Sequence, residues 1–311
     1  MADEAHVFSM VVGWSYRVLE LAEALAPTVG HHITPAPTVS VFRADSAAKN
    51  VPKFQQPGTL FILQGTEKLS CPGNVHIVDP DHFMLTSAPV AFHIDTDAAV
   101  TKPLLSVHVA FDPATAMDIA SQMEWQGGAI SKPAAICQTS GRIDDSMKDF
   151  LYRLLTTLCD PLACRILIQG LIRELHFLLL QRDEGSAILA GLEGRGARGK
   201  VLKTAAELLD RRRVGITINT VAASAELGLS SYHSHFKALF GSTPLEYLKA
   251  ARLHDARNLL RSRDVNIAAV GQAVGYKGTS QFSREFHRHF GRTAREERKL
   301  LEISKSNSDL V

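Results

Sequence analysis

Cysteine is rare in this sequence and is not spaced for disulfide or metal chemistry. Four cysteines occur among 311 residues, and none of them forms a CxxC pair. A dense disulfide framework is therefore excluded. We expect all four thiols to be reduced and mostly buried as small apolar side chains: Cys71, Cys137, Cys159 and Cys164.

The sequence also lacks a recognisable targeting segment and a membrane span. It begins with the acidic residues Asp3 and Glu4, where a secretory signal peptide would be basic. The most apolar run, Ile166 to Leu180, is interrupted by Arg173 and Glu174 and is too polar to cross a bilayer. We therefore expect a cytoplasmic protein that has no membrane partner.

A large net charge is absent from the whole chain but not from its two halves. The chain carries 34 Lys and Arg against 32 Asp and Glu, a net charge of +2. Residues 1–198 hold 15 basic and 21 acidic side chains (net −6), whereas residues 199–311 hold 19 basic and 11 acidic ones (net +8). This division predicts two domains, of which the second binds nucleic acid or another anionic surface.

The first half has the pattern of a small β-domain followed by helices, which predicts an α+β fold. Between about residues 32 and 112, short runs rich in β-branched and aromatic residues are separated by Pro, Gly and Asp turns. Such runs are typical of a sandwich or a small barrel, and we predict a small β-barrel. In the run Ser106 to Phe111, alternation places Val107 and Val109 on one face and Ser106 and His108 on the other.

Helical spacing follows at about 114–123 and 146–181, and the last of these helices carries a broad apolar stripe. The stripe contains leucines at helical spacing: Leu167, Leu171, Leu175 and Leu179. It covers the β-domain, forms a subunit interface, or does both. Because the stripe is wider than one flank requires, we predict a homodimer through this helix.

A glycine-rich segment separates the two halves. Residues 191–199 contain four glycines and two arginines, and the sign of the charge changes across them. We therefore predict a sensor and dimerisation domain over 1–190, a linker over 191–199, a second domain over 200–298 and a tail over 299–311.

The basic half contains an internal repeat. The hexapeptide FKALFG at 236–241 recurs 50 residues later as FHRHFG at 286–291, and VAASA at 221–225 matches VGQAV at 270–274. Each copy has the pattern of a short helix, a tight turn and a second helix that buries three aromatic rings. The repeat predicts helix-turn-helix motifs at about 218–240 and 267–290 in an all-α domain.

The outer face of each second helix carries side chains that could read DNA. They recur at i, i+3, i+4 and i+7, so they can reach base edges and phosphates in a major groove. The predicted contacts are Ser230, His233, Ser234 and Lys237 in the first copy and Ser280, Gln281, Ser283, Arg284 and His287 in the second. The alternative is two solvated helix faces in an all-helical interaction module. No acidic side chain occurs at these positions, which favours double-stranded DNA as the partner.

One long helix is expected between the two motifs. It begins at Pro244 and has no breaker for about 17 residues, which corresponds to about 25 Å. With the motifs at its two ends, the second helices could lie about 34 Å apart, one turn of duplex DNA.

Residues of about 200–292 resemble the AraC/XylS family of transcription regulators. The resemblance rests on Pro244-x-x-Tyr247-x-x-x-x-Arg252-Leu253 and on Val274-Gly275-Tyr276 followed by Ser280-Gln281-Phe282-Ser283-Arg284-Glu285-Phe286. The first half is similar to the cupin-like sensor domain of the family at Val39 to Asp45, Leu63-Gln64-Gly65 and Asp79-Pro80. The resemblance implies a regulator controlled by a small-molecule effector. It further favours an activator, whose partners would include RNA polymerase.

The sequence departs from the family pattern at four positions. Glu226 stands where the first turn usually has glycine, and Gly228 and Gly278 replace the usual capping serine. Ala294 stands where proline is common. A glycine cap costs only a few tenths of a kcal/mol, so the resemblance holds.

Polar residues of the predicted barrel strands are candidates for binding the effector: Arg43, His76, His93 and His108. A cupin-type metal-dependent enzyme is the first rival interpretation, but it needs a His-x-His pair plus a carboxylate, and the barrel region has no such pair. A DNA-alkylation repair protein would need clustered cysteines near the N-terminus, whereas the first cysteine is Cys71. We therefore expect no enzyme activity, no metal and no cofactor.

Overall fold

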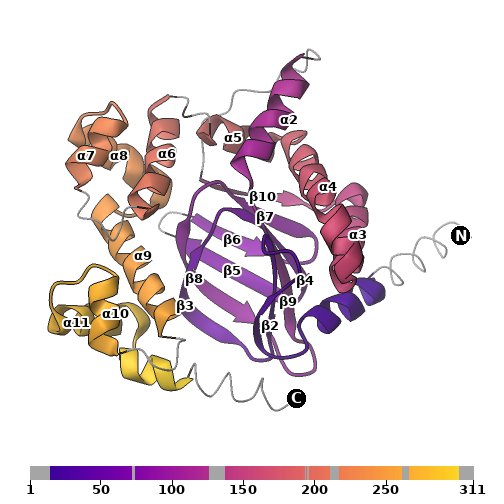
Figure 1. Ribbon diagram of the computed structural model, residues 1–311, viewed down its shortest axis with the longest axis horizontal. Coiled ribbons are helices and arrows are strands. Elements are labelled where there is room, and N and C mark those ends of the chain that lie inside the picture. The colour runs from indigo at the N-terminus through magenta and orange to yellow at the C-terminus, as the bar shows by residue number, and fades with distance from the viewer. Residues whose placement is uncertain are drawn as a thin grey trace, which may run out of the picture.

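A computed structural model describes residues 15–71, 74–125, 137–192, 194, 196–210, 217–260 and 266–300. The last residues of the predicted tail, 301–311, lie outside this described part. Figure 1 shows two β-sheets in the centre, helices α2 to α4 along one side and helices α6 to α11 along the other. The α+β class is confirmed.

Within the described residues, ten strands form two antiparallel sheets. One sheet has six strands in the order β1-β2-β9-β4-β7-β10, and the other has four in the order β3-β8-β5-β6. The strands are β1 (Gly30–Ile33), β2 (Val39–Ala44), β3 (Ala48–Gln55), β4 (Gly58–Gln64), β5 (Thr66–Cys71), β6 (Asn74–Val78), β7 (His82–Thr86), β8 (Val90–Asp97), β9 (Leu104–Ala110) and β10 (Gln138–Arg142).

The sheets do not close into the predicted barrel. Each has two edge strands, β1 and β10 in the larger sheet and β3 and β6 in the smaller, so the domain is an open sandwich. Alternating strands with turns every few residues are common to sandwiches and barrels. The sequence pattern therefore identified the strands without determining whether the sheets would close.

Alternation along the central strands decides what lies on each face of the six-stranded sheet. Val107 and Val109 on β9 are buried in the core that includes α3 and α4, as predicted. Ser106 and His108 on the same strand line the space between the sheets. Ser106 and His108 thus face a cavity, whereas Val107 and Val109 face a helical layer.

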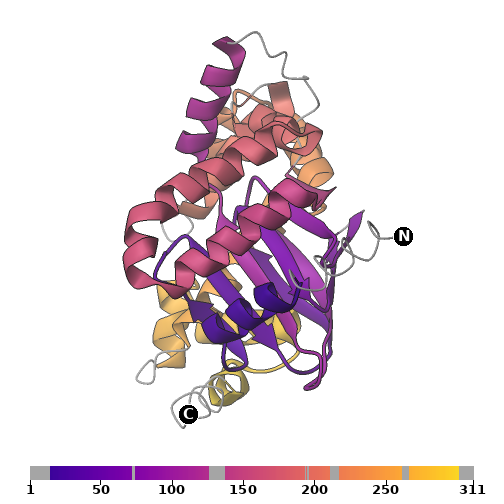
Figure 2. The same cartoon turned by 90° about the vertical axis from the view of Figure 1, so that its right-hand side faces the viewer.

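Helices cover the outer face of the six-stranded sheet, as Figure 2 shows for α3 and α4. They are α3 (Asp145–Cys159) and α4 (Pro161–Leu180), and residues 15–25 form a further helix. Helix α2 (Pro113–Trp125) packs on α4 and not on the sheet. Asp144 caps α3 by accepting a hydrogen bond from the Met147 backbone N–H. Asp160 caps α4, whose first residue is Pro161.

The leucine stripe of α4 faces the core of its own chain. Leu171, Leu175 and Leu179 are 7%, 1% and 1% exposed and pack in one cluster with α3 and the sheet, whereas Leu167 is 52% exposed. The predicted interface therefore cannot be built from this stripe. Its breadth reflects contact with two neighbours within the chain, α3 and the sheet.

The second half folds into helices arranged as two helix-turn-helix units joined by a long helix. The first half ends with α5 (Asp183–Leu192). The helices of the second half are α6 (Gly196–Asp210), α7 (Ile218–Ser224), α8 (Leu229–Phe240), α9 (Pro244–Leu259), α10 (Ile267–Ala273) and α11 (Thr279–Phe290). At the start of α9, Thr243 and Glu246 form a capping box, and Pro244 occupies the first turn.

The glycine-rich segment is more helical than predicted. The end of α5 includes residues 191 and 192, and α6 begins at Gly196, within the predicted linker of 191–199. Glycine costs about 1 kcal/mol in a helix interior, which tertiary packing can offset. Here α6 packs through Val201, Leu202 and Ala205 into a core that it shares with α8.

The sandwich and the helical half share part of their cores. One buried cluster contains Leu69 and Phe92 of the four-stranded sheet together with Phe236 of α8. The Tyr247 hydroxyl of α9 donates a hydrogen bond to the Pro89 carbonyl at 2.6 Å. In the described part of the chain, no helix is long and apolar enough to cross a membrane.

Candidate nucleic-acid interface and ligand cavity

The first recognition helix, α8, presents a polar face to solvent. Tyr232, Phe236 and Phe240 are buried, which turns the opposite side of the helix outward. On that side Ser230, Ser234 and Lys237 are exposed and His233 is half-buried. The structure therefore places all four predicted residues of the first motif on one accessible surface.

The second recognition helix, α11, presents a more basic face. All five predicted residues are exposed: Ser280, Gln281, Ser283, Arg284 and His287. The nearby Glu285 carboxylate is occupied, because it pairs with Lys249 at 3.2 Å and accepts a hydrogen bond from the Tyr276 hydroxyl at 2.9 Å. The acid of this helix is thus turned toward α9, which leaves the outer face free of negative charge.

The two helix-turn-helix units differ in the residue at their turn. In the second unit this residue is Gly275, with φ of 90°, a left-handed conformation that glycine adopts at low cost. In the first unit it is Glu226, with φ of 54°, which is unfavourable for a side chain with a Cβ. Glu226 forms an ion pair with Lys200 of α6, which helps to hold the turn.

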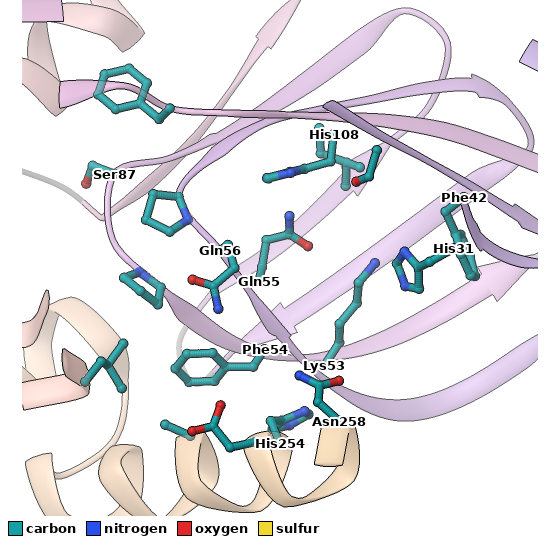
Figure 3. Close-up of a pocket in the computed structure, with 18 of the residues that line it drawn as sticks. His31, Phe42, Lys53, Phe54, Gln55, Gln56, Ser87, His108, His254 and Asn258 are labelled. Carbon is teal, nitrogen blue, oxygen red and sulfur yellow. The ribbon is translucent and has the colours of Figure 1, made fainter. Parts of the chain in front are cut away.

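A cavity of about 680 Å³ lies between the two sheets and is closed on one side by α9. Figure 3 shows Lys53 and Gln55 of β3 and His108 of β9 directed into this space, while Phe54 points toward α9. His254 of α9 also lines the cavity. Its wall is therefore built from the sandwich and from the helical half together.

One of the four predicted effector residues lines this cavity, namely His108. Arg43 instead pairs with Asp45 at 2.8 Å. His76 on β6 and His93 on β8 are not among the residues of the cavity wall. A polar side chain on a strand can face either side of a sheet, so its strand alone did not identify the lining.

Several lining residues were missed by the sequence analysis. Lys53 and Gln55 alternate with Phe54, and this alternation would have placed them on one face of β3. His254 had no comparable signal, because α9 reaches the cavity only through tertiary packing between the two halves.

His108 is neutral in this environment. Burial and the neighbouring Lys53 charge lower its pKa to about 4, although a hydrogen bond with the Gln56 backbone acts in the opposite direction. Its ring lies against Gly58, where a Cβ would approach the His108 Nε2 to 2.5 Å. Gly58 therefore leaves the room that the His108 ring occupies.

His254 connects the cavity wall to the second recognition helix. Its Nε2 lies 3.1 Å from the Nε2 of His289 on α11, and its ring packs on Phe54 at 5.8 Å between centroids. Burial and neighbouring positive groups lower the pKa of His254 to about 3 and that of His289 to about 4. Two neutral imidazoles can share one hydrogen bond, with one ring as donor and the other as acceptor.

The described residues contain no group of three or more His, Cys, Asp or Glu side chains that could hold a metal ion. The arrangement provides two exposed helix faces and one cavity between the sheets.

Comparison with known proteins agrees with this geometry. Residues 35–187 match the model of the AraC-type transcriptional regulator N-terminus, and residues 221–300 match that of a helix-turn-helix domain. The chain belongs to the AraC/XylS family. The transcriptional activator RhaS of Enterobacter sp. is 35% identical over 133 residues, 42% of this chain and 47% of RhaS. RhaS of Escherichia fergusonii is 31% identical over 164 residues, 52% of this chain and 58% of RhaS. The chain thus spans about half the length of these curated relatives.

A solved structure resembles most of the chain. ToxT from Vibrio cholerae, solved with a bound unsaturated fatty acid, superposes with a TM-score of 0.60 at 10% identity and covers 84% of this chain and 94% of its own. At this identity the likeness establishes the fold alone.

A departure from the AraC/XylS pattern has a structural explanation. Ala294, where proline is common, follows Thr293, whose hydroxyl accepts a hydrogen bond from the Glu296 backbone N–H at 3.2 Å. The Glu296 carboxylate accepts one from the Thr293 backbone N–H at 2.7 Å. This capping box repeats that of Thr243 and Glu246. It stabilises the N-terminus of the helix over 294–300 without proline.

Proposed function

We propose that this protein is a sequence-specific, DNA-binding transcription activator, controlled by a small molecule in the cavity between its sheets. The observation that carries the proposal is the pair of exposed, acid-free recognition faces on α8 and α11, at opposite ends of α9. It acts as a regulator and not as an enzyme, in the cytoplasm, with RNA polymerase as a further partner. The regulators named among its relatives support this role.

The two recognition helices bind successive major grooves on one side of the duplex. Arg284 is long enough to donate two hydrogen bonds to guanine, whereas Ser234, its counterpart in α8, selects weakly. Lys237 and His287 lie one turn further along and bind phosphates. The first motif therefore contributes mainly affinity, and the second contributes more of the sequence preference.

The cavity is the effector site of the proposed regulator. Its wall includes β3 and β9 of the sandwich and α9, the helix that joins the two motifs. A ligand there changes the contacts between the sandwich and α9, and thereby the placement of the second recognition helix relative to the first. ToxT, which shares the fold, has been solved with a fatty acid bound, and this supports a small-molecule effector for a protein of this fold.

The protein acts as a homodimer through a different face of α4 from the one predicted. The exposed apolar residues of α4 are Leu162, Ile166, Leu167 and Phe177, between 42% and 68% exposed. Leu162, Ile166 and Phe177 lie at helical spacing along one side of α4. Sedimentation at micromolar concentration should give a dimer that Ile166→Glu dissociates, whereas Leu171→Ala should lower stability without this selective effect.

Binding of the full-length protein to duplex DNA tests the proposal. Fluorescence anisotropy should give an affinity that falls steeply as salt rises from 50 to 200 mM, by roughly 10³-fold for about six phosphate contacts. Lys237→Ala should weaken binding to every sequence and reduce the salt dependence. The surface variant Lys49→Ala, on β3, is the control. An affinity that does not change with salt would contradict the proposal.

A further inference from the structure

Lys53 is the cation that is best placed to hold a ligand in the cavity. It is half-buried on β3, and its ammonium group is directed into the space between the sheets (Figure 3). Its Nζ lies 5.4 Å from the centroid of the Phe42 ring. Within the described residues, no carboxylate forms an ion pair with it. An ammonium group packed on an aromatic ring in this way can take up an anionic partner.

The other cations of the cavity wall are engaged or exposed. Arg257 pairs with Glu297 at 2.6 Å and lies over the Phe290 ring at 5.3 Å. Lys203 of α6 is exposed at the rim. Asp255 is the one carboxylate among the described lining residues, against three Lys and Arg side chains. The cavity wall thus carries net positive charge, which favours an anion.

The charge of Lys53 affects the protonation of His108 inside the cavity. Together with burial, it holds the pKa of His108 near 4, well below the usual value. Interactions between charges are stronger in a partly buried site, where water screens them less. An acid group bound next to Lys53 would gain from the same field that keeps His108 neutral.

The rest of the cavity wall mixes polar and apolar side chains, and the apolar ones contribute more of its exposed surface. Phe42 and Leu60 line it on the side of the sandwich, and Leu202, Leu209 and Ala251 line it on the side of the helices. Its volume of about 680 Å³ is that of a site for a ligand with an extended apolar body. The cavity therefore combines one position that favours an anion, beside Lys53, with apolar surface on both sides.

We propose that the cavity binds an amphipathic monocarboxylic acid, whose carboxylate accepts a hydrogen bond from Lys53 and whose apolar body lies against Leu202 and Leu209. The Gln55 amide, directed into the same space, is a second donor for the carboxylate. This inference rests on the proposed function of the cavity as the effector site. A fatty acid and an arylalkanoic acid share this chemistry, and the probes below distinguish them.

Calorimetric titration of the full-length protein tests the ligand class. The probes are octanoic acid and 4-phenylbutanoic acid, each with its neutral primary amide as a control of the same size. At pH 7.5 at least one acid should bind about 10- to 100-fold more tightly than its amide, as expected for a hydrogen bond between charged groups. The acid that binds more tightly shows whether the apolar body of the ligand is aliphatic or aromatic. Equal affinities for acid and amide, or no binding of any probe, would overturn the proposal.

Variants assign the charge preference to Lys53. Lys53→Met should reduce the affinity for the acid to that of the amide while leaving the amide unchanged, and Lys53→Arg should retain most of the preference. Lys49→Met, an exposed lysine of the same strand that does not line the cavity, is the matched control and should change neither affinity. A lower affinity of Lys53→Met for acid and amide alike would show a merely structural role and overturn the assignment.

DNA binding by the same samples separates this inference from the proposed function. Sequence-specific DNA binding without any preference for acids would leave the regulator in place and remove the ligand class. Lys53-dependent binding of the acid by a protein that does not bind DNA would support the cavity chemistry and contradict the regulator.

Discussion

The two helix-turn-helix units have the same architecture but belong to different cores. Phe236 of the first unit is buried in a cluster that continues into the four-stranded sheet through Leu69 and Phe92. Phe286 of the second unit is buried in a separate cluster with Leu253 and Phe290, made up of residues from α9 onward. The first unit is therefore anchored to the sandwich, whereas the second is stabilised mainly by its own packing on α9.

Polar contacts follow the same division. Near the first unit, the Cys137 thiol donates a hydrogen bond to the Leu239 carbonyl of α8 at 2.9 Å. The second unit is tied to the wall of the cavity through the imidazole contact of His289 with His254. We infer that a ligand in the cavity acts on the second unit through α9 and this contact, while the first unit stays fixed on the sandwich.

The largest expected effect comes from truncating the central ring of each unit. Phe236 and Phe286 are both 0% exposed, so each Phe→Ala change should cost about 3–5 kcal/mol of stability. Phe236→Ala should lower the melting temperature of the sandwich as well, because the core is shared. Phe286→Ala should melt the second unit early and leave the sandwich transition in place.

Differential scanning calorimetry distinguishes these two outcomes. A single transition shifted equally in both variants would mean that the two units belong to one cooperative core.

The second-largest effect should be a loss of stability of the second unit in mild acid. His254 and His289 have pKa values lowered to about 3 and 4 in the folded state, so in mild acid the unfolded chain binds protons that the folded chain does not. Their stabilising contribution is complete above the unfolded value, near 6.5, and is lost as pH falls toward the folded values. Between pH 6.5 and 5 each histidine should cost about 2 kcal/mol of stability.

Urea unfolding at pH 7.5 and pH 5 measures this loss. His289→Gln should reduce the pH dependence, whereas the same change at the exposed His287 should leave it as in the wild type. Identical pH dependences in His289→Gln and the wild type would refute the role of the histidine pair.

Base discrimination should differ between the units by a smaller amount. Arg284→Ala should relax the preference at one base pair by about 1–3 kcal/mol, because a guanidinium group can donate to guanine O6 and N7 together. Ser234→Ala should change the base preference little, because a hydroxyl group can form hydrogen bonds with several different bases. A scan of single base substitutions with both variants measures the difference. If Arg284→Ala weakens binding to all operator variants equally, Arg284 contacts the backbone only.

The smallest effects concern the two turns. Gly275→Ala places a Cβ at φ of 90° and should cost about 1–2 kcal/mol. The reverse change, Glu226→Gly, relieves strain at φ of 54° but gives the unfolded chain more freedom, for a net gain of about 0.5 kcal/mol. Chemical denaturation of both variants gives these values. Destabilisation by Glu226→Gly would mean that its ion pair with Lys200 outweighs the backbone strain.

Most of the helical half could be predicted from local and repeated sequence signals. The helices and turns of both units were predicted because FKALFG and FHRHFG recur in sequence, and the long helix between them because Pro244 marks its first turn. The outward placement of Arg284 and Lys237 followed from the periodicity of the buried rings around them.

Features that depend on long-range packing were not predictable in the same way. Alternation along a strand is the same in a sandwich and in a barrel, so the closure of the sheets was missed. Leu171 and Leu175 would be equally apolar against a sheet or against a second subunit. The approach of His254 to the cavity depends on how α9 packs on β3, a contact between residues about 200 positions apart.

Selection of binding sites from a random pool of duplex DNA by the full-length protein tests the central claim most directly. Two recognition helices of unequal selectivity should enrich two blocks of bases about 10 base pairs apart, centre to centre, with the stronger preference in the block that Arg284 reads. The Arg284→Ala variant should lose that preference and keep the other block. Enrichment of no sequence, or of a single block that Arg284→Ala does not alter, would contradict a regulator that reads DNA with two unequal motifs.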